Sequence, residues 1–364
     1  MLFRSTPFLQ EWSKRREMPK PIPPATVAAS VPPDFDRVYF EDCARFPFDP
    51  VAVGYHPANA WWLAEAAFAA YDGSEASGSF RIDLRHLFAA GYQAARYAAG
   101  TTQFLAIENE AALIIAFRGT RLDGFSIPGV KVTGFAANWG DVLTDANLLP
   151  ESLQRGVLVH GGFLRAFGTI ETLLTPLVEN AVRSGHTVWF CGHSLGAALA
   201  TIAAYHHREQ TQGLYTFGSP RVGNRLLAVE LSEAVPGTFR FVHHRDIVTT
   251  VPPDGLRIPA DLSDLREIWS VLRERGSTGY THVGQVKYIS GGQAWQVGEN
   301  EETGGFSAMA ADAALHFREI LKVLSVGNVS PTETGTWPIF YDAIADHAPV
   351  YYANKLFNVL EESA

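Results

Sequence analysis

Short apolar runs alternate along this chain with longer segments in which apolar residues recur at helical spacing. Ala, Leu, Phe and Trp recur in this way over His56–Tyr71 and Leu84–Ala99, which predicts two amphipathic helices. Ala111–Phe117 is an uncharged run, typical of a strand that is buried on both faces of a parallel sheet. Gly161–Ser184 then predicts a long helix that is interrupted at Pro176.

The same alternation continues through the second half of the chain. The pattern predicts strands at Thr187–Cys191, Leu214–Phe217, Thr238–His243 and Val283–Ile289, and helices at Leu195–Tyr205, Asp261–Arg275 and Phe306–Val326. Strands that alternate with helices are typical of a mostly parallel central sheet flanked by helices. We therefore predict an α/β fold.

Composition limits the classes of protein that need to be considered. The chain has 364 residues, 47% apolar content and a net charge of −9, and it lacks a basic stripe, so nucleic acid is not an expected partner. Cys43 and Cys191 are too few for a disulfide framework, and we expect Cys191 to be buried at a strand end. We see neither a leader-like segment nor an apolar run long enough for a transmembrane helix, so the default expectation is a cytoplasmic protein, with secretion left open.

The segment Gly192-His193-Ser194-Leu195-Gly196 carries the clearest chemical signal. It lies between the apolar run that ends at Cys191 and an alanine-rich helical segment, as a nucleophile elbow does. At such an elbow a serine sits on a sharp strand-to-helix turn, and glycines on either side avoid collision with the neighbouring backbone. Ser194 is therefore predicted to be a nucleophile, and the alternative is a serine in an ordinary glycine turn.

A serine nucleophile needs a histidine base and an acid that orients the base. In α/β hydrolases the acid follows the serine in the chain and lies just after a strand. Asp246 follows the predicted strand Thr238–His243 and precedes Pro252 and Pro253, so it is the predicted acid. The alternative reading of Asp246 is a carboxylate in a surface turn.

Several motifs together resemble the class 3 lipases. They are Ala116-Phe117-Arg118-Gly119-Thr120, Asn138-Trp139 with Asp141 and Asp145, His160-Gly161-Gly162-Phe163, the elbow, Tyr215 to Asn224 (Tyr-Thr-Phe-Gly-Ser-Pro-Arg-Val-Gly-Asn), and Asp246-Ile247-Val248. The resemblance covers roughly residues 105–290. It implies an α/β-hydrolase fold and a carboxylic ester hydrolase that works through a Ser-His-Asp triad without a cofactor or metal.

The resemblance also implies roles for individual residues. Ser194 would be the nucleophile, Asp246 the acid, and the backbone N–H groups of Thr120 and Leu195 the oxyanion hole. The base is less clearly marked: His347, in an Asp-His-x-Pro pattern before a final helical segment, is preferred, while His316 and His282 are the alternatives.

The domain boundaries follow from composition and from the resemblance. Residues 1–35 are proline-rich and predict an extended N-terminal tail, and residues 36–364 predict one α/β-hydrolase domain. Relative to compact family members, this domain carries insertions at about 121–137, 254–278 and 299–338. The first occupies the family's lid position, and it is either a mobile lid or a hairpin packed permanently on the body.

The predicted function is that of a triacylglycerol lipase or esterase acting on lipid esters, with an oil–water interface as a candidate place of action. The same triad serves a phospholipase A1 or a feruloyl-type esterase, and a non-catalytic lipid- or partner-binding relative is the alternative from another class. The sequence leaves the acyl chain length and the oligomeric state open.

Overall fold

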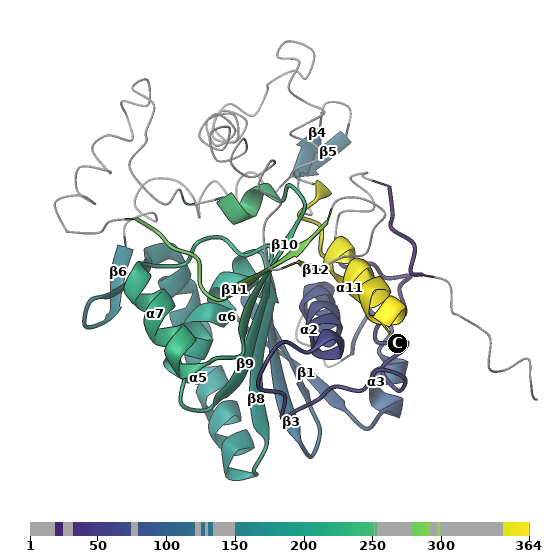
Figure 1. The fold of residues 1–364 in the computed structure, drawn as a ribbon, viewed down its shortest axis with the longest axis horizontal. Coiled ribbons are helices and arrows are strands. Elements are labelled where there is room, and N and C mark those ends of the chain that lie inside the picture. The colour runs from purple at the N-terminus through teal and green to yellow at the C-terminus, as the bar shows by residue number, and fades with distance from the viewer. Residues whose placement is uncertain are drawn as a thin grey trace, which may run out of the picture.

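The fold is built around a twisted, mostly parallel β-sheet (Figure 1). The computed structural model describes residues 19–24, 32–73, 79–120, 125–127, 130–133, 150–250, 252, 279–290, 297–298 and 345–363. Over these residues the sheet has the order β1-β2-β3-β8-β9-β10-β11-β12. The strands are β1 (Gln93–Ala99), β2 (Thr102–Glu108), β3 (Ala112–Phe117), β8 (Thr187–His193), β9 (Thr211–Phe217), β10 (Thr238–His243), β11 (Gln285–Ile289) and β12 (Val297–Gly298).

The centre of this sheet is parallel and its two edges are antiparallel. Strands β3, β8, β9, β10 and β11 pair in parallel, whereas β1 pairs with β2, β2 with β3, and β11 with β12 in antiparallel fashion. The carboxyl ends of β3, β8, β9 and β10 consequently lie along one edge of the sheet. This edge is where ligands bind in open α/β sheets.

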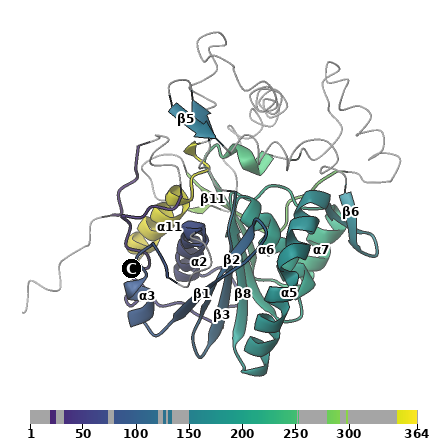
Figure 2. The ribbon, with the colours of Figure 1, turned by 180° about the vertical axis from the view of Figure 1, so that it is seen from behind.

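Helices cover both faces of the sheet, as Figures 1 and 2 show for α2 (Pro57–Ala69) and α11 (Pro349–Ser363) on one face. The other face carries α5 (Gly161–Arg183), α6 (Leu195–His206) and α7 (Arg225–Ala234). Alternate residues of β3 supply the two cores: Leu113, Ile115 and Phe117 pack toward α5 and α6, and Ala112, Ile114 and Ala116 toward α2. This alternation follows from the two-residue period of a strand.

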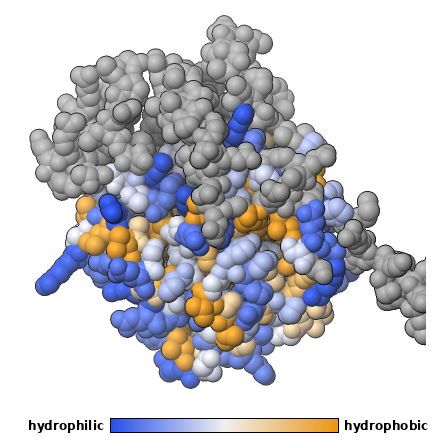
Figure 3. All heavy atoms as spheres, in the orientation of Figure 1, coloured by the Kyte–Doolittle hydropathy of each residue, from blue (hydrophilic) through white to orange (hydrophobic). Residues whose placement is uncertain are grey.

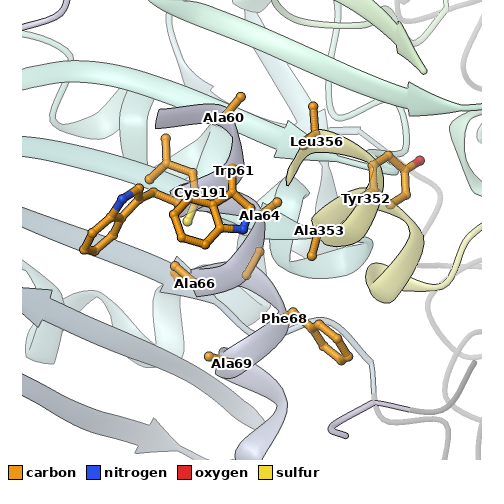
Figure 4. Close-up of a cluster of buried hydrophobic side chains, with 14 of the residues drawn as sticks. Ala60, Trp61, Ala64, Ala66, Phe68, Ala69, Cys191, Tyr352, Ala353 and Leu356 are labelled. Atoms are coloured by element: carbon orange, nitrogen blue, oxygen red, sulfur yellow. The ribbon is translucent and has the colours of Figure 1, made fainter. Parts of the chain in front are cut away.

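Helix α2 is buried on every side, so the predicted amphipathic character of His56–Tyr71 is wrong although the helix is present. It lies between the sheet and α11, where Trp61 and Phe68 pack near Ala353 and Leu356 (Figure 4). A helix that is apolar all round belongs in a core rather than at a surface. A short 3-10 helix, Ala70–Asp72, continues α2.

The predicted helix over Leu84–Ala99 is also wrong. Only α3 (Arg85–Ala89) is helical; the chain then turns at Gly91, with φ of 85°, and enters β1. Tyr97 of β1 stacks on its cross-strand partner Phe104, with ring centroids 4.9 Å apart. Cross-strand pairing with β2 therefore outweighs the helical preference of the alanines.

Helix α5 runs through Pro176 without the predicted interruption. The remaining described elements are a 3-10 helix, Ile247–Thr250, and two short hairpins: β4 (Phe125–Ile127) with β5 (Val130–Thr133), and β6 (Pro150–Gln154) with β7 (Val157–His160). The first hairpin lies within the predicted insertion 121–137. The predicted insertions 254–278 and 299–338, with their two predicted helices, lie outside the described residues.

The proline-rich segment 19–24 lies along α11. The Lys20 backbone and the Asn358 side chain exchange two hydrogen bonds, of 2.7 and 3.0 Å, and Asn354 donates to the Pro21 carbonyl at 2.8 Å. The Tyr351 hydroxyl donates to the Pro23 carbonyl at 3.2 Å. The segment thus fastens the helix that follows His347.

Polar and apolar residues are intermixed over the described face in Figure 3, as on most soluble protein surfaces. Among the described residues, no helix is long and apolar enough to cross a bilayer. Within the same ranges, no three His, Cys, Asp or Glu side chains come together as metal ligands would.

Candidate active site

Ser194 lies on a sharp turn between β8 and α6. Its φ of 62° and ψ of −130° are unusual for a residue with a side chain, and such strain is often found at functional sites. A Cβ at Gly192 would overlap the carbonyl of Gly196, and one at Gly196 would overlap the carbonyl of Phe117. Only glycine therefore fits at either position, and the close approach brings the end of β3 against the start of α6.

Asp246 is fully buried in the loop that follows β10, and it accepts several hydrogen bonds. The donors are His347 Nδ1 at 2.8 Å from Oδ2, the Tyr352 hydroxyl at 2.6 Å, and the Val248 backbone N–H at 2.9 Å from Oδ1. Burial alone would raise the pKa of Asp246, but His347 and these hydrogen bonds lower it below its usual value. The carboxylate is therefore ionised and is a fixed acceptor for the imidazole.

His347 stands just before α11, and its ring lies beside the elbow. The His347 and His193 ring centroids are 4.4 Å apart, and His193 immediately precedes Ser194. Because Nδ1 donates to Asp246, Nε2 carries the lone pair of the neutral ring and is the atom able to take a proton.

His193 itself is held in the core. Its Nε2 donates to the His347 carbonyl at 2.6 Å, and its Nδ1 accepts from the Tyr71 hydroxyl at 2.8 Å. Burial and the neighbouring His347 lower the pKa of His193 far below its ordinary value, so the ring stays neutral. His193 therefore packs and orients the base loop, and its nitrogens are engaged away from Ser194.

The two predicted oxyanion donors belong to the segments that meet at the elbow. Leu195 is the first residue of α6, where backbone N–H groups lack intrahelical partners. Thr120 follows the end of β3 by three residues, and its hydroxyl is buried without a hydrogen-bond partner among the described residues. A preorganised N–H group beside a reacting carbonyl is what an oxyanion hole requires.

The competing histidines do not share this arrangement within the described residues. Burial and the neighbouring Arg240 and Arg221 lower the pKa of His282 well below its usual value. The donors to Asp246 named above do not include His282. His316 lies outside the described residues, so its place stays open. His160, fully buried, stacks on Phe163 with centroids 4.2 Å apart.

Sequence reasoning missed three residues that shape this site. Tyr352 donates to Asp246 and accepts the His243 N–H, and Asp346 contacts the loop that carries Asp246. Gly218, with φ of 57°, leaves room for the pair: a Cβ there would lie 2.6 Å from Asp246 Oδ2 and 2.8 Å from His347 Nδ1. The available signals were the nearness of Asp346 and Tyr352 to His347 in the sequence and the place of Gly218 within the Tyr215–Asn224 motif.

Comparison with known proteins relates part of this chain to lipases. The family model described as Lipase (class 3) matches residues 114–256. A secreted mono- and diacylglycerol lipase of Fusarium solani is 38% identical over 105 residues, which are 28% of this chain and 32% of the relative. A lipase of Rhizomucor miehei is 30% identical over 158 residues, 40% of this chain and 39% of the relative.

The matched region is thus only about a third of the length of these curated relatives. Among solved structures, lipase II from Rhizopus niveus superposes with a TM-score of 0.48 and 20% identity, covering 71% of this chain and 91% of that one.

Proposed function

We propose that this chain, whose residues 114–256 match the class 3 lipase family model, is a serine hydrolase that cleaves carboxylic esters of lipids, triacylglycerols among them. The observation that carries the proposal is the buried Asp246–His347 pair, whose imidazole lies beside the elbow that bears Ser194. A nucleophile, an oriented base and an acid are the parts needed for acyl transfer.

In the proposed reaction the Ser194 hydroxyl oxygen attacks the ester carbonyl, and His347 Nε2 takes the hydroxyl proton. The backbone N–H groups of Thr120 and Leu195 donate to the resulting oxyanion. His347 then gives its proton to the departing alcohol, which leaves an acyl group on Ser194. Water, deprotonated by His347, attacks the acyl-enzyme, and His347 returns the proton to the Ser194 oxygen as the fatty acid leaves.

Asp246 has two tasks in this scheme. Its carboxylate accepts from Nδ1 and so holds the tautomer in which Nε2 can act as the base. Its negative charge also stabilises the imidazolium that forms during each proton transfer. The Tyr352 hydroxyl and the Val248 N–H keep the carboxylate in place.

The other readings of the sequence are less well supported. The two relatives described above are named as a mono- and diacylglycerol lipase and a lipase, which supports acylglycerols as substrates, and a phospholipase A1 of Arabidopsis thaliana that is 29% identical over 153 residues makes a phospholipid the second candidate. The hydrogen bond between Asp246 and His347 argues against a non-catalytic binding protein.

The fluorophosphonate reaction tests the proposal, because such reagents label an activated serine. We expect labelling of the wild-type protein and none of Ser194→Ala. His347→Ala should lose at least about 10³-fold in kcat on a short soluble ester, while His282→Ala and His316→Ala should stay near wild type. A wild-type protein that neither labels nor hydrolyses esters would refute the proposal.

Three further expectations belong to it. We infer one domain over residues 36–364, supported by a core whose buried members run from Tyr39 to Leu360. A mobile lid over residues 121–137, one of the two readings of the sequence, predicts a rise in activity when the ester forms an emulsion, whereas a permanently packed hairpin predicts no such rise. The name of the Fusarium solani relative favours secretion over the cytoplasmic expectation, and fractionation of the producing cells would test this.

A further inference from the structure

Two loops that are far apart in the sequence meet at the site, and each contributes a carboxylate to an imidazole on the other. The first loop follows β10 and carries His244 and Asp246; the second precedes α11 and carries Asp346 and His347. Asp246 of the first loop accepts from His347 Nδ1 at 2.8 Å. Asp346 of the second loop lies 2.8 Å, through Oδ2, from His244 Nδ1. The two pairs are thus reciprocal.

Asp346 has further contacts with the first loop. Its Oδ2 also accepts the Arg245 backbone N–H at 3.2 Å, and its carbonyl accepts from His243 Nδ1 at 2.8 Å. Burial lowers the pKa of His243 to about 4, so this ring is neutral at physiological pH and donates one N–H. Every residue from His243 to Arg245 therefore bonds to Asp346.

The partner loop is itself held in a fixed shape. His244 has a positive φ of 43°, which is uncommon for a residue with a side chain. Its N–H donates to the Ile289 carbonyl at 2.9 Å, and its carbonyl accepts from the Tyr288 hydroxyl at 3.3 Å. These bonds anchor the loop to β11. The His244 side chain is only 36% exposed and that of Asp346 15%, so water competes weakly for their hydrogen bond.

We propose that Asp346 is a positioning residue, which fixes the loop carrying His347 against the loop carrying Asp246 and so sets the place of the base relative to Ser194. The inference rests on the proposed hydrolase function. His347 is followed closely by α11, and its carbonyl accepts from His193 Nε2 at 2.6 Å. The bonds from Asp346 add a further point of attachment, one residue before the base. Displacement of a catalytic group by about 1 Å can cost about 10²-fold in rate.

Asp346→Ala and Asp346→Asn separate positioning from general stability. In Asp346→Ala we expect kcat to fall about 10- to 100-fold, with KM within about twofold of wild type, because the substrate site is untouched. Asp346→Asn keeps an oxygen that can accept from Arg245 and His244, and should stay within about fivefold of wild type. Asp36→Ala removes an exposed carboxylate elsewhere and should change nothing.

His244→Gly completes a double-mutant cycle, because glycine tolerates the positive φ and removes only the ring. We expect it to lower kcat less than Asp346→Ala does, and the double variant to be no slower than Asp346→Ala, since both changes break one pair. Fully additive losses would overturn the inference. So would an Asp346→Ala enzyme within twofold of wild type in kcat.

A proton spectrum separates this inference from the proposed function. The His347 Nδ1–H, donated to Asp246, should give a low-field resonance in the wild-type protein that weakens in Asp346→Ala. If the wild type is inert toward esters and fluorophosphonate but the resonance still depends on Asp346, the proposed function fails and the positioning role stands. If the wild type is active and neither kcat nor the resonance responds to Asp346→Ala, the positioning role fails alone.

Discussion

Gly218→Ala tests the site geometry with the smallest possible side chain. The new Cβ would lie 2.6 Å from Asp246 Oδ2 and 2.8 Å from His347 Nδ1, much closer than atoms of these types pack. The φ of 57° also disfavours alanine, at a cost of about 1–2 kcal/mol in folding free energy. Because both atoms of the Asp246–His347 hydrogen bond must move, we expect kcat on a short ester to fall about 10²- to 10⁴-fold, as losses of triad geometry do elsewhere.

Gly100→Ala is the matched control for this substitution. Gly100 has nearly the same φ, 58°, but no atom lies within 4 Å of the place a Cβ would take. We expect it to lower the free energy of unfolding by the same 1–2 kcal/mol or so and to leave kcat near wild type. Thermal unfolding, steady-state kinetics and fluorophosphonate labelling of both variants give the comparison. The reasoning is refuted if Gly218→Ala retains kcat within twofold, or if both variants lose activity equally.

Three further predictions concern charges that the fold buries. Tyr352→Phe removes a donor to Asp246 and should lower kcat about 10-fold, which corresponds to about 1.4 kcal/mol; kinetics on a soluble ester would check this, and an unchanged kcat would contradict it. Because the pKa of Asp246 is lowered in the folded protein, its contribution to stability is present above the ordinary carboxyl pKa of 3.8 and is lost as pH falls through the lower folded value. Asp246→Asn should therefore show a shallower loss of stability in acid than wild type, measured by denaturant unfolding at several pH values, and equal slopes would count against the assignment. Arg37→Ala leaves the fully buried Glu65 of α2 without its ion-pair partner and should lower the unfolding free energy by about 3–5 kcal/mol. Glu65→Gln, with Arg37 intact, tests the loss of the negative charge of the same pair. A loss below about 1 kcal/mol in Arg37→Ala would show that water or Lys20 compensates for the missing guanidinium.

Local rules predicted the parts of the site that depend on neighbouring residues. The elbow follows from two glycines that relieve backbone overlap around Ser194, and Asp246 follows from its place at the end of a strand. Both signals operate within a few residues. The central strands and α6 were predicted in the same way, from the spacing of apolar residues along short segments. The family resemblance then directed attention to Thr120 and Leu195, whose roles stay predictions.

Contacts across long stretches of chain were beyond such rules. The bonds from Asp346 and Tyr352 to the β10 loop join residues more than 100 positions apart, and no local pattern specifies their register. Two wrong predictions have the same origin. The alanines of β1 were predicted to be helical but pair with β2 as a strand, and α2 is covered on its second side by α11, which comes almost 300 residues later. A predicted amphipathic helix became a core helix for that reason.

Helix α11 has a consequence for the order in which the protein is made. The nucleophile and its acid leave the ribosome well before the imidazole, which follows Asp246 by 101 residues. A nascent chain that ends within the insertion therefore exposes an elbow without a proton acceptor. Only when the residues of α11 have emerged and docked against α2 is the proposed triad complete, so the last part of the chain to be made decides when the proposed hydrolase can act.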